Sequence, residues 1–204
     1  MRIIKFFADL ISQRGDDLSL EQIKDYLKMI STNSERMSNL VDSLHDLSSV
    51  SQSNLNKVLF KIEPFIESTL SEEVRQNDET KISLQFDIER VYGDAELLRR
   101  LFSNLISNAL KFSASEPNPV VKIHCFDRRT YFCFRISDNG IGIADNKREE
   151  VFELFNRQTN YSDYKGLGIG LALSKKIVDM HSGTIHILNS DLGGVCVEVR
   201  LPLS

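Results

Sequence analysis

Tryptophan is absent from this 204-residue chain, and cysteine, histidine and proline are scarce, with 3, 4 and 4 copies. The three cysteines, Cys125, Cys133 and Cys196, form no Cys-x-x-Cys pair and no zinc-ligand spacing with histidine. These counts disfavour a disulfide framework and a structural zinc site. We expect reduced, buried thiols instead.

Long apolar runs are also missing. No stretch approaches the roughly 20 residues that a membrane span needs. Residues 1–9 lack both the apolar core and the small-residue cleavage site of a signal peptide. We therefore expect no membrane segment in this chain and a cytoplasmic location, although a full-length protein containing the chain could be membrane-anchored.

An excess of positive charge is missing as well. The 25 Lys and Arg residues against 29 Asp and Glu give a net charge of −4, whereas nucleic-acid binders cluster positive charge to neutralise phosphates. We therefore expect no nucleic-acid partner. The composition, 41% hydrophobic and 26% charged residues, is that of a globular protein, and the length suits one large domain or two small ones.

A long helix is predicted from residue 18 to about residue 57, because apolar or small residues recur at alternating steps of four and three. Ser19 is the expected N-cap, and Gln22 has the capping-box spacing behind it. A shorter helix is predicted over residues 2–14, with a turn at residues 15–17. The seam of the long helix comprises Ile23, Leu27, Ile30, Ser34, Met37, Val41, Leu44 and Ser48.

These two helices form a predicted hairpin with arms of unequal length. Such a hairpin cannot cover both of its apolar stripes, so we expect two copies to dimerise into a four-helix bundle. Small polar seam members such as Ser34 and Ser48 suit a bundle better than a tight two-stranded coil. The alternative is that the hairpin packs on the rest of its own chain.

From about residue 58 the pattern changes to a mixture of strands and helices. Alternating polar and apolar residues predict strands, and longer periodic segments predict helices. Cys125 and Cys133 flank a predicted hairpin and could be close to each other. This order of elements predicts an α+β sandwich, one sheet covered by helices. The predicted strands cover residues 60–63, 81–88, 120–126, 131–136, 184–189 and 195–201, and the helices follow Pro64 and cover about 94–112 and 170–180.

The first chemically informative segment is residues 104–112. On a helix, Asn104, Asn108 and Lys111 share one face next to an apolar face. An asparagine carbonyl is a hard, neutral ligand that suits Mg²⁺, and a lysine ammonium is a point charge for phosphate. The alternative reading is a solvated polar flank of the helix.

The second segment is an apolar strand that runs into Asp138 and then two glycines, Gly140 and Gly142. An aspartate can accept a hydrogen bond from the exocyclic amine of adenine, and glycines let the backbone approach a flat ring closely. An ordinary turn at the end of a strand would look the same.

The third segment places Gly166, Gly168 and Gly170 directly before a predicted helix. Exposed backbone N–H groups at a helix N-terminus attract phosphate. The spacing is neither that of a Walker loop nor the dinucleotide fingerprint.

A polar stretch, residues 156–165, lies between the second and third segments and lacks apolar periodicity. A long structureless segment inside a compact domain usually forms a functional lid. Phe152 and Phe155 could anchor it.

In this order, the segments resemble the ATP-binding domain of sensor histidine kinases, a superfamily shared with type II topoisomerases, ninety-kilodalton heat-shock chaperones and mismatch-repair MutL proteins. Residues 104–112 resemble the family's asparagine box, 138–142 its first glycine box, 152–155 its phenylalanine box and 166–170 its second glycine box. The resemblance predicts a dimerisation and phosphotransfer hairpin, residues 1–57, followed by an α/β sandwich of the histidine-kinase ATPase (Bergerat) type, residues 58–204.

The resemblance also implies a role for each box, with ATP and Mg²⁺ as cofactors. Asp138 would bind the adenine amine, Asn108 the Mg²⁺ ion, and Asn104 and Lys111 the phosphates. The residues expected to bind the nucleotide are Asn104, Asn108, Lys111, Phe112, Asp138, Gly140, Gly142, Phe152, Phe155, Gly166, Leu167, Gly168, Ile169, Gly170 and Leu171.

Asn104 separates the branches of this superfamily. In the topoisomerase and chaperone branches, its place is taken by a glutamate that activates water. An amide does not take a proton near neutral pH and cannot be that general base. Asn104 therefore favours a kinase over an ATP hydrolase.

The chain departs from the family pattern in two places. None of the four histidines, His45, His124, His181 and His186, stands in the family's His-Glu/Asp-Leu-Arg-x-Pro box. The phosphoacceptor would fall a few residues before Met1, and the chain as it stands is expected not to autophosphorylate. The family also often has Thr or Ser after the last glycine pair, whereas Val195 follows Gly194 here.

The predicted function is the ATP-binding core of a two-component sensor histidine kinase. It would transfer the γ-phosphoryl group of ATP to a histidine and then to a response-regulator receiver domain, which docks near residues 20–45. The alternatives are a non-catalytic nucleotide-binding or scaffolding module, a serine kinase of the anti-sigma type, and a water-activating ATPase.

Overall fold

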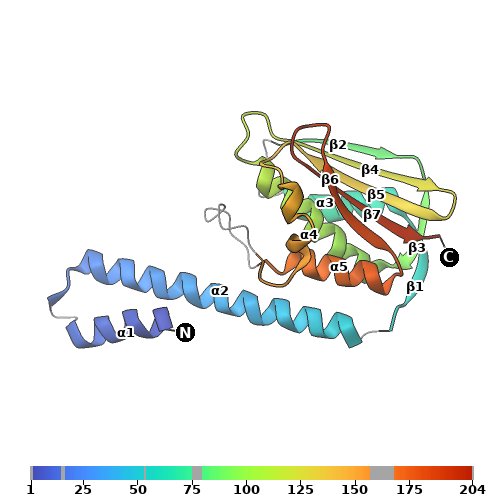
Figure 1. Cartoon of the computed structure of the whole chain (residues 1–204). Coiled ribbons are helices and arrows are strands. Elements are labelled where there is room, and N and C mark those ends of the chain that lie inside the picture. The colour runs from blue at the N-terminus through green and yellow to red at the C-terminus, as the bar shows by residue number, and fades with distance from the viewer. Residues whose placement is uncertain (1, 15–16, 53, 75–79, 157–167, 204) are drawn as a thin grey trace. The chain divides into compact units, whose positions relative to one another are not determined.

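The computed structural model describes residues 2–14, 17–52, 54–74, 80–156 and 168–203. The chain divides into two compact units, residues 1–48 and residues 49–204. Figure 1 shows a helical first unit and a second unit of helices and strands. The predicted fold class is confirmed, because a helical region is followed by an α+β sandwich.

The first unit contains α1 (Arg2–Arg14) and most of α2 (Leu20–Gln52). The predicted capping box is present, because Gln22 N donates to Ser19 Oγ at 3.2 Å and Ser19 N donates to Gln22 Oε1 at 2.9 Å. α2 ends at Gln52 and not near residue 57, because Lys57 already begins a strand. None of the described helices has the length and apolar character needed to cross a bilayer.

The apolar seam of α2 lies on the surface of this single chain. Val41 is 60% exposed, Leu27 52%, Met37 42% and Leu44 40%. Exposed large apolar side chains at heptad spacing are typical of a helix face that another helix covers.

The second unit is built on a five-stranded sheet of order β2-β4-β5-β7-β6. The β2–β4 pair is parallel and the other three pairs are antiparallel. The strands are β2 (Lys81–Phe86), β4 (Val120–Arg128), β5 (Tyr131–Asp138), β6 (Thr184–Asn189) and β7 (Val195–Pro202).

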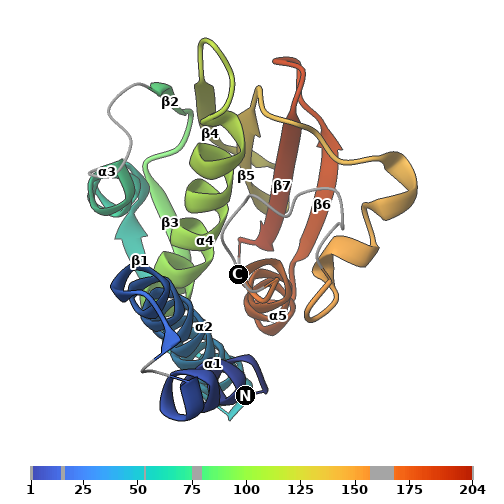
Figure 2. The same cartoon turned by 90° about the vertical axis from the view of Figure 1, so that its left-hand side faces the viewer.

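Three helices, α3 (Ile62–Val74), α4 (Ala95–Ser113) and α5 (Gly170–Met180), cover one face of this sheet (Figure 2). The core lies between the two layers. Phe102 of α4 packs on Phe134 of β5 with ring centroids 4.1 Å apart, and both side chains are fully buried. Arg99 of α4 donates to the hydroxyls of Ser68 and Thr69 on α3 at 3.1 and 3.2 Å. These contacts fix α4, which carries the first candidate segment, against the sheet and its neighbouring helix.

A second, two-stranded sheet pairs β1 (Lys57–Lys61) with β3 (Arg90–Asp94). Alternating polar and apolar residues predict the first strand at residues 60–63, whereas β1 ends at Lys61 and Ile62 already begins α3. The sequence pattern does not predict β3. The reason is that β3 is short and ends in Gly93 and Asp94, which are poor strand formers that serve as the entry to α4.

The cysteines are free and buried, as predicted. Cys125 pairs with Phe134, and Cys133 pairs with Phe126 across the β4–β5 hairpin. Neighbouring residues on a strand point to opposite faces, so Cys125 and Cys133 lie on opposite faces of the sheet. Burial raises the pKa of all three thiols, which makes them poor nucleophiles.

Candidate functional site

Asp138 is the last residue of β5, and its side chain is 6% exposed. Its Oδ1 accepts hydrogen bonds from Gly140 N at 2.9 Å and Val195 N at 3.1 Å. Oδ2 has no hydrogen-bond partner among the described residues. Burial raises the pKa of the Asp138 carboxyl, and the two backbone N–H donors act in the opposite direction. Asp138 therefore offers one free acceptor atom in fixed orientation, which suits the reading of an amino group.

The turn after β6, at Gly194, and the first residue of β7, Val195, support this carboxylate. Gly194 donates its N–H to the carbonyl of Asp138 at 3.2 Å, and any Cβ on Gly194 would collide with Oδ1 of Asp138. The backbone N–H of Val195 is the second donor to Oδ1 of this carboxylate.

The loop after Asp138 packs directly on the end of α4. A Cβ on Gly140 would collide with the carbonyl of Phe112, so only glycine fits there. Asn139 fastens the same loop, because its Oδ1 accepts from Val120 N at 2.8 Å and its Nδ2 donates to Asn118 O at 2.8 Å. Gly142 has φ +73°, a conformation that favours glycine.

The polar face of α4 lies at the rim of the core, as predicted. Asn104, Asn108, Lys111 and Phe112 are all half-buried. Neither asparagine side chain hydrogen-bonds to another described residue. The Lys111 ammonium lies 4.6 Å from the centroid of the Phe112 ring, a cation–π distance. Two half-buried amides with unused hydrogen-bonding groups form a surface that a polar ligand can occupy.

The helix that follows the glycines begins beside this face. α5 starts at Gly170, and a Cβ there would lie 3.3 Å from Oδ1 of Asn104. Ile169, the residue before it, is buried, and Leu171 is half-buried. The N-cap residue, Ile169, makes no side-chain capping hydrogen bond to α5. As far as the described residues go, the first N–H groups of α5 are therefore left for an anion next to Asn104.

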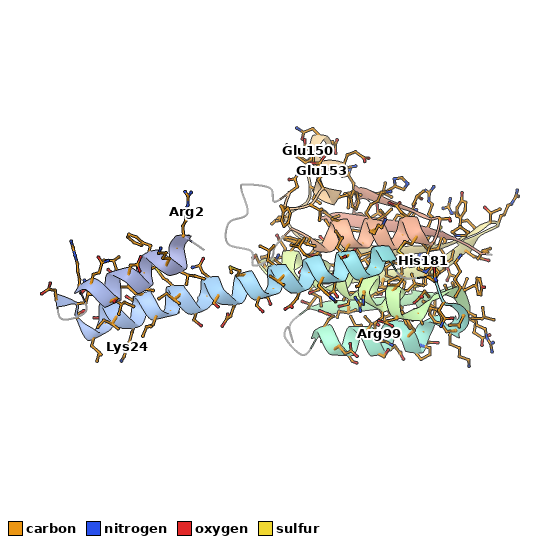
Figure 3. The ribbon with its side chains drawn as sticks, turned by 90° about the horizontal axis from the view of Figure 1, so that it is seen from below. Arg2, Lys24, Arg99, Glu150, Glu153 and His181 are labelled. Carbon is orange, nitrogen blue, oxygen red and sulfur yellow. The ribbon has the colours of Figure 1, made fainter. Side chains whose placement is uncertain are left out.

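The residues around the predicted lid come together at its two ends. Phe155 N donates to Gly168 O at 3.1 Å. Phe152 ends η3 (Glu150–Phe152) and is half-buried, whereas Phe155 is 52% exposed with φ +62°. Gly168 has φ +71°. Figure 3 places Glu150 and Glu153 on this segment. Gly166 and Leu167 lie outside the described residues.

Metal ligands are sparse around this site. Among the described residues, no three His, Cys, Asp or Glu side chains form a cluster that could hold a metal ion. Mg²⁺ in nucleotide sites commonly takes one or two protein oxygens together with phosphate oxygens and water. The amide of Asn108, which hydrogen-bonds to no other described residue, could hold an ion in this way.

Comparison with known proteins agrees with this arrangement. Residues 93–204 match the family described as "Histidine kinase-, DNA gyrase B-, and HSP90-like ATPase". The circadian input-output histidine kinase CikA of Synechococcus elongatus is 30% identical over 196 residues, covering 89% of this chain and 25% of CikA. The chain spans 14% to 31% of the length of eight such curated relatives.

Two solved structures show the same fold. The mycobacterial sensor histidine kinase MprB matches 71% of this chain and 96% of its own with a TM-score of 0.64 and 25% identity. The histidine kinase ThkA in complex with response regulator protein TrrA matches 99% of this chain and 58% of its own, with a TM-score of 0.73 and 22% identity. By these matches, the chain belongs to the histidine kinase-, DNA gyrase B-, and HSP90-like ATPase family and contains the ATPase domain of a sensor histidine kinase.

Proposed function

We propose that ATP binds between the polar face of α4 and the glycine-rich start of α5, with its adenine against Asp138. The single observation that carries this proposal is the hydrogen bonding of Asp138. Its Oδ1 is held by two backbone N–H groups, which leaves Oδ2 to accept from the adenine amine. The buried Oδ2 of Asp138 can only accept a hydrogen bond, so it should bind the amino group of adenine. GTP, whose base has a carbonyl in place of that amino group, should be rejected.

The phosphates lie, in this proposal, near Asn104, Lys111 and the N-terminus of α5. The unpaired N–H groups and the helix dipole of α5 favour negative charge. Asn108 holds the Mg²⁺ ion, which neutralises charge on the phosphates when it is bound. This chain's residues then position the γ-phosphoryl group for transfer, because phosphoryl transfer depends mainly on positioning and charge stabilisation.

The acceptor of the γ-phosphoryl group is a histidine, and a response-regulator receiver domain takes it next, docking near residues 20–45 of the hairpin. Sensor histidine kinases among the relatives, and ThkA in complex with a response regulator, support this assignment. Asn104 supports transfer over hydrolysis because its amide cannot act as a general base toward water.

None of the four histidines of this chain stands in the family's phosphoacceptor box. His181 is also 2% exposed, and both of its ring nitrogens are engaged. His124 hydrogen-bonds to Asp87 at 2.7 Å. His45 and His186 are exposed. We therefore expect this chain to bind ATP without labelling itself.

Incubation with γ-labelled ATP tests the proposal. The predicted result is no acid-labile label on the chain alone, slow phosphate release, and label on a histidine-containing hairpin supplied in trans. Acid-labile label on the chain alone would show that one of its own histidines is the acceptor. Rapid phosphate release without label would favour a water-activating ATPase.

A further inference from the structure

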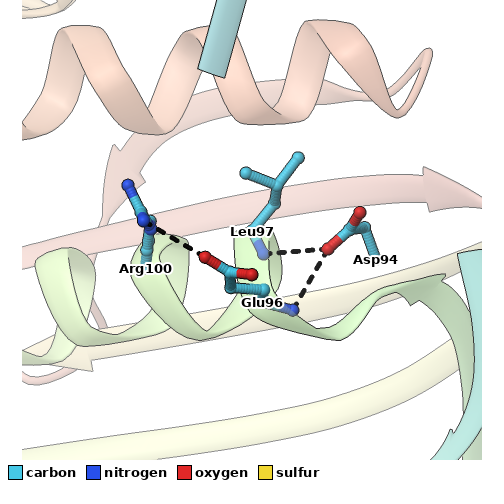
Figure 4. A network of polar contacts seen from close by, with 4 residues as sticks. All are labelled: Asp94, Glu96, Leu97 and Arg100. Atoms are coloured by element: carbon cyan, nitrogen blue, oxygen red, sulfur yellow. Dashed lines mark hydrogen bonds and ion pairs between the residues drawn. The ribbon is translucent and has the colours of Figure 1, made fainter. Parts of the chain in front are cut away.

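Asp94 lies where the entry segment of the second unit, β3 and α4 meet. It is 8% exposed and is the N-cap of α4. Its Oδ1 accepts from Glu96 N and Leu97 N, both at 3.1 Å (Figure 4). Capping by one oxygen already satisfies two of the unpaired N–H groups in the first turn of α4.

The second carboxylate oxygen makes a different connection. Oδ2 of Asp94 accepts from the backbone N–H of Asn56 at 2.8 Å. Asn56 lies four residues after Gln52, the last residue of α2, and immediately before β1. One carboxylate therefore joins the chain that enters the second unit to the helix that carries Asn104, Asn108 and Lys111.

The main chain of Asp94 reaches the other helix of the site. Asp94 N donates to Nε2 of His181 at 3.1 Å, and His181 follows the last residue of α5. Since Nε2 accepts, Nδ1 carries the proton and donates to Ile177 O at 2.8 Å. Figure 3 shows His181 at this end of α5. Gly93 keeps the junction close, because a Cβ there would lie 2.6 Å from Leu98 Cδ1 and 3.5 Å from Nε2 of His181.

We infer that Asp94 is a positioning residue that couples the entry segment, residues 54–57, to the nucleotide site through the axial placement of α4. The inference rests on the proposed nucleotide site. The start of α4 and the end of α5 are held together at Asp94, while the end of α4 and the start of α5 form the site. A displacement of Asn56 therefore changes where α4 presents its amides, since a packed helix moves as a rigid element.

Two substitutions break the same hydrogen bond from opposite sides. Asp94→Asn keeps an oxygen for the α4 cap but places an NH₂ group where Oδ2 accepted, and Asn is a good N-cap. Asn56→Pro removes the N–H and leaves Asp94 intact. Asn56→Ala is the matched control, because it retains the N–H.

Isothermal titration of the whole chain with Mg-ATP, well below the melting temperature of each variant, gives the first readout. We expect about fivefold weaker Mg-ATP binding for Asp94→Asn and for Asn56→Pro. This loss is smaller than that expected from losing a charge-assisted hydrogen bond inside the site, because Asp94 acts only through the position of α4. The double variant should be no weaker than either single variant, because one bond is lost in all three. Asn56→Ala should stay within about twofold of the wild type.

Unchanged affinity for Asn56→Pro, with or without a lower melting temperature, would overturn the inference and leave Asp94 with a capping role alone. Additive losses in the double variant would also overturn it. Absence of ATP binding by the wild-type chain would refute the proposed function. Hydrogen exchange without nucleotide tests the coupling of Asn56 to α4 even in that case. Asn56→Pro should speed exchange in α4 relative to β5 and β7, and equal exchange in these elements would contradict the coupling.

Discussion

The backbone N–H of Val195 lies 3.1 Å from Oδ1 of Asp138 and donates a hydrogen bond to it, which joins the first residue of β7 to the last residue of β5. This bond orients the carboxylate and lowers the cost of keeping a buried charge.

Val195→Pro should weaken ATP binding, because proline has no N–H and is tolerated at the first residue of a strand. We expect about a tenfold loss, the scale of one hydrogen bond to a charged group. Val195→Ala is the matched control and should bind ATP as the wild type does. Equal affinities for the proline and alanine variants, measured by isothermal titration, would show that the bond does not support the carboxylate.

Asn108→Ala should reduce ATP affinity more in the presence of Mg²⁺ than in EDTA, because the amide oxygen is expected to bind the ion and not the nucleotide. Titrations in both conditions provide the measurement. Asn118→Ala, a side chain on the exposed turn after α4, serves as a control that should leave both affinities unchanged. Equal losses with and without Mg²⁺ would assign Asn108 a packing role.

Replacing Val41 and Leu44 by glutamate should dissociate the proposed dimer. Both side chains are exposed on the single chain, so the isolated helix tolerates charge there. In a four-helix bundle each buried charge would cost several kcal/mol, on the order of the penalty for an unpaired polar group in a core. Light scattering should give a dimer mass for the wild type and a monomer mass for the double variant.

The matched control places the same two charges off the seam, at Thr32 and Asn39, which are exposed on another side of the heptad. That variant should remain a dimer. A wild-type monomer at tens of micromolar would refute the bundle.

His181 makes the stability of the second unit depend on pH. Burial lowers its pKa below the ordinary value of 6.5, so between the two pKa values the unfolded chain binds more protons than the folded one. The free energy of unfolding therefore falls as the pH drops below about 6.5. His181→Gln, whose amide can accept from Asp94 N without titrating, should remove this dependence.

Urea unfolding at pH 7.5 and pH 5.5 compares the two proteins, with the exposed His186→Gln as control. The loss of stability between these pH values should be larger in the wild type and in His186→Gln than in His181→Gln. Parallel losses in all three would exclude His181 as the titrating group.

The regular parts of this fold could be predicted from the sequence. The Ser19 and Gln22 capping box, the helix at residues 170–180 and the strands at 184–189 and 195–201 follow from local patterns, because capping and periodicity act over a few residues. β3 could not be predicted in this way, since its pairing with β1 joins residues 29 to 37 positions apart, from Lys61–Arg90 to Lys57–Asp94, and Gly93 and Asp94 are poor strand formers.

In the candidate site, too, local patterns could be predicted from the sequence and contacts between distant segments could not. Asp138 is visible in the sequence at the end of a predicted strand, and Asn104 and Asn108 are visible as spaced residues on one predicted helix. The bonds from Val195 N to Asp138 and from Asn56 N to Asp94 each join a backbone N–H donor to a carboxylate on a segment distant in the sequence. The backbone N–H group is common to all residues except proline, so such a bond leaves no mark in the side-chain pattern.

The most direct test of the account is the titration of the chain with ATP, comparing the wild type with Asp138→Asn. The substitution keeps the shape of the side chain but can turn a donor toward the adenine amine in place of the acceptor Oδ2, so we expect a loss of at least about a hundredfold, the scale of an unpaired buried polar group. GTP should bind the wild type far more weakly than ATP. Equal ATP affinity in the two proteins, or equal affinity of the wild type for ATP and GTP, would contradict the assignment of Asp138 as the residue that reads adenine.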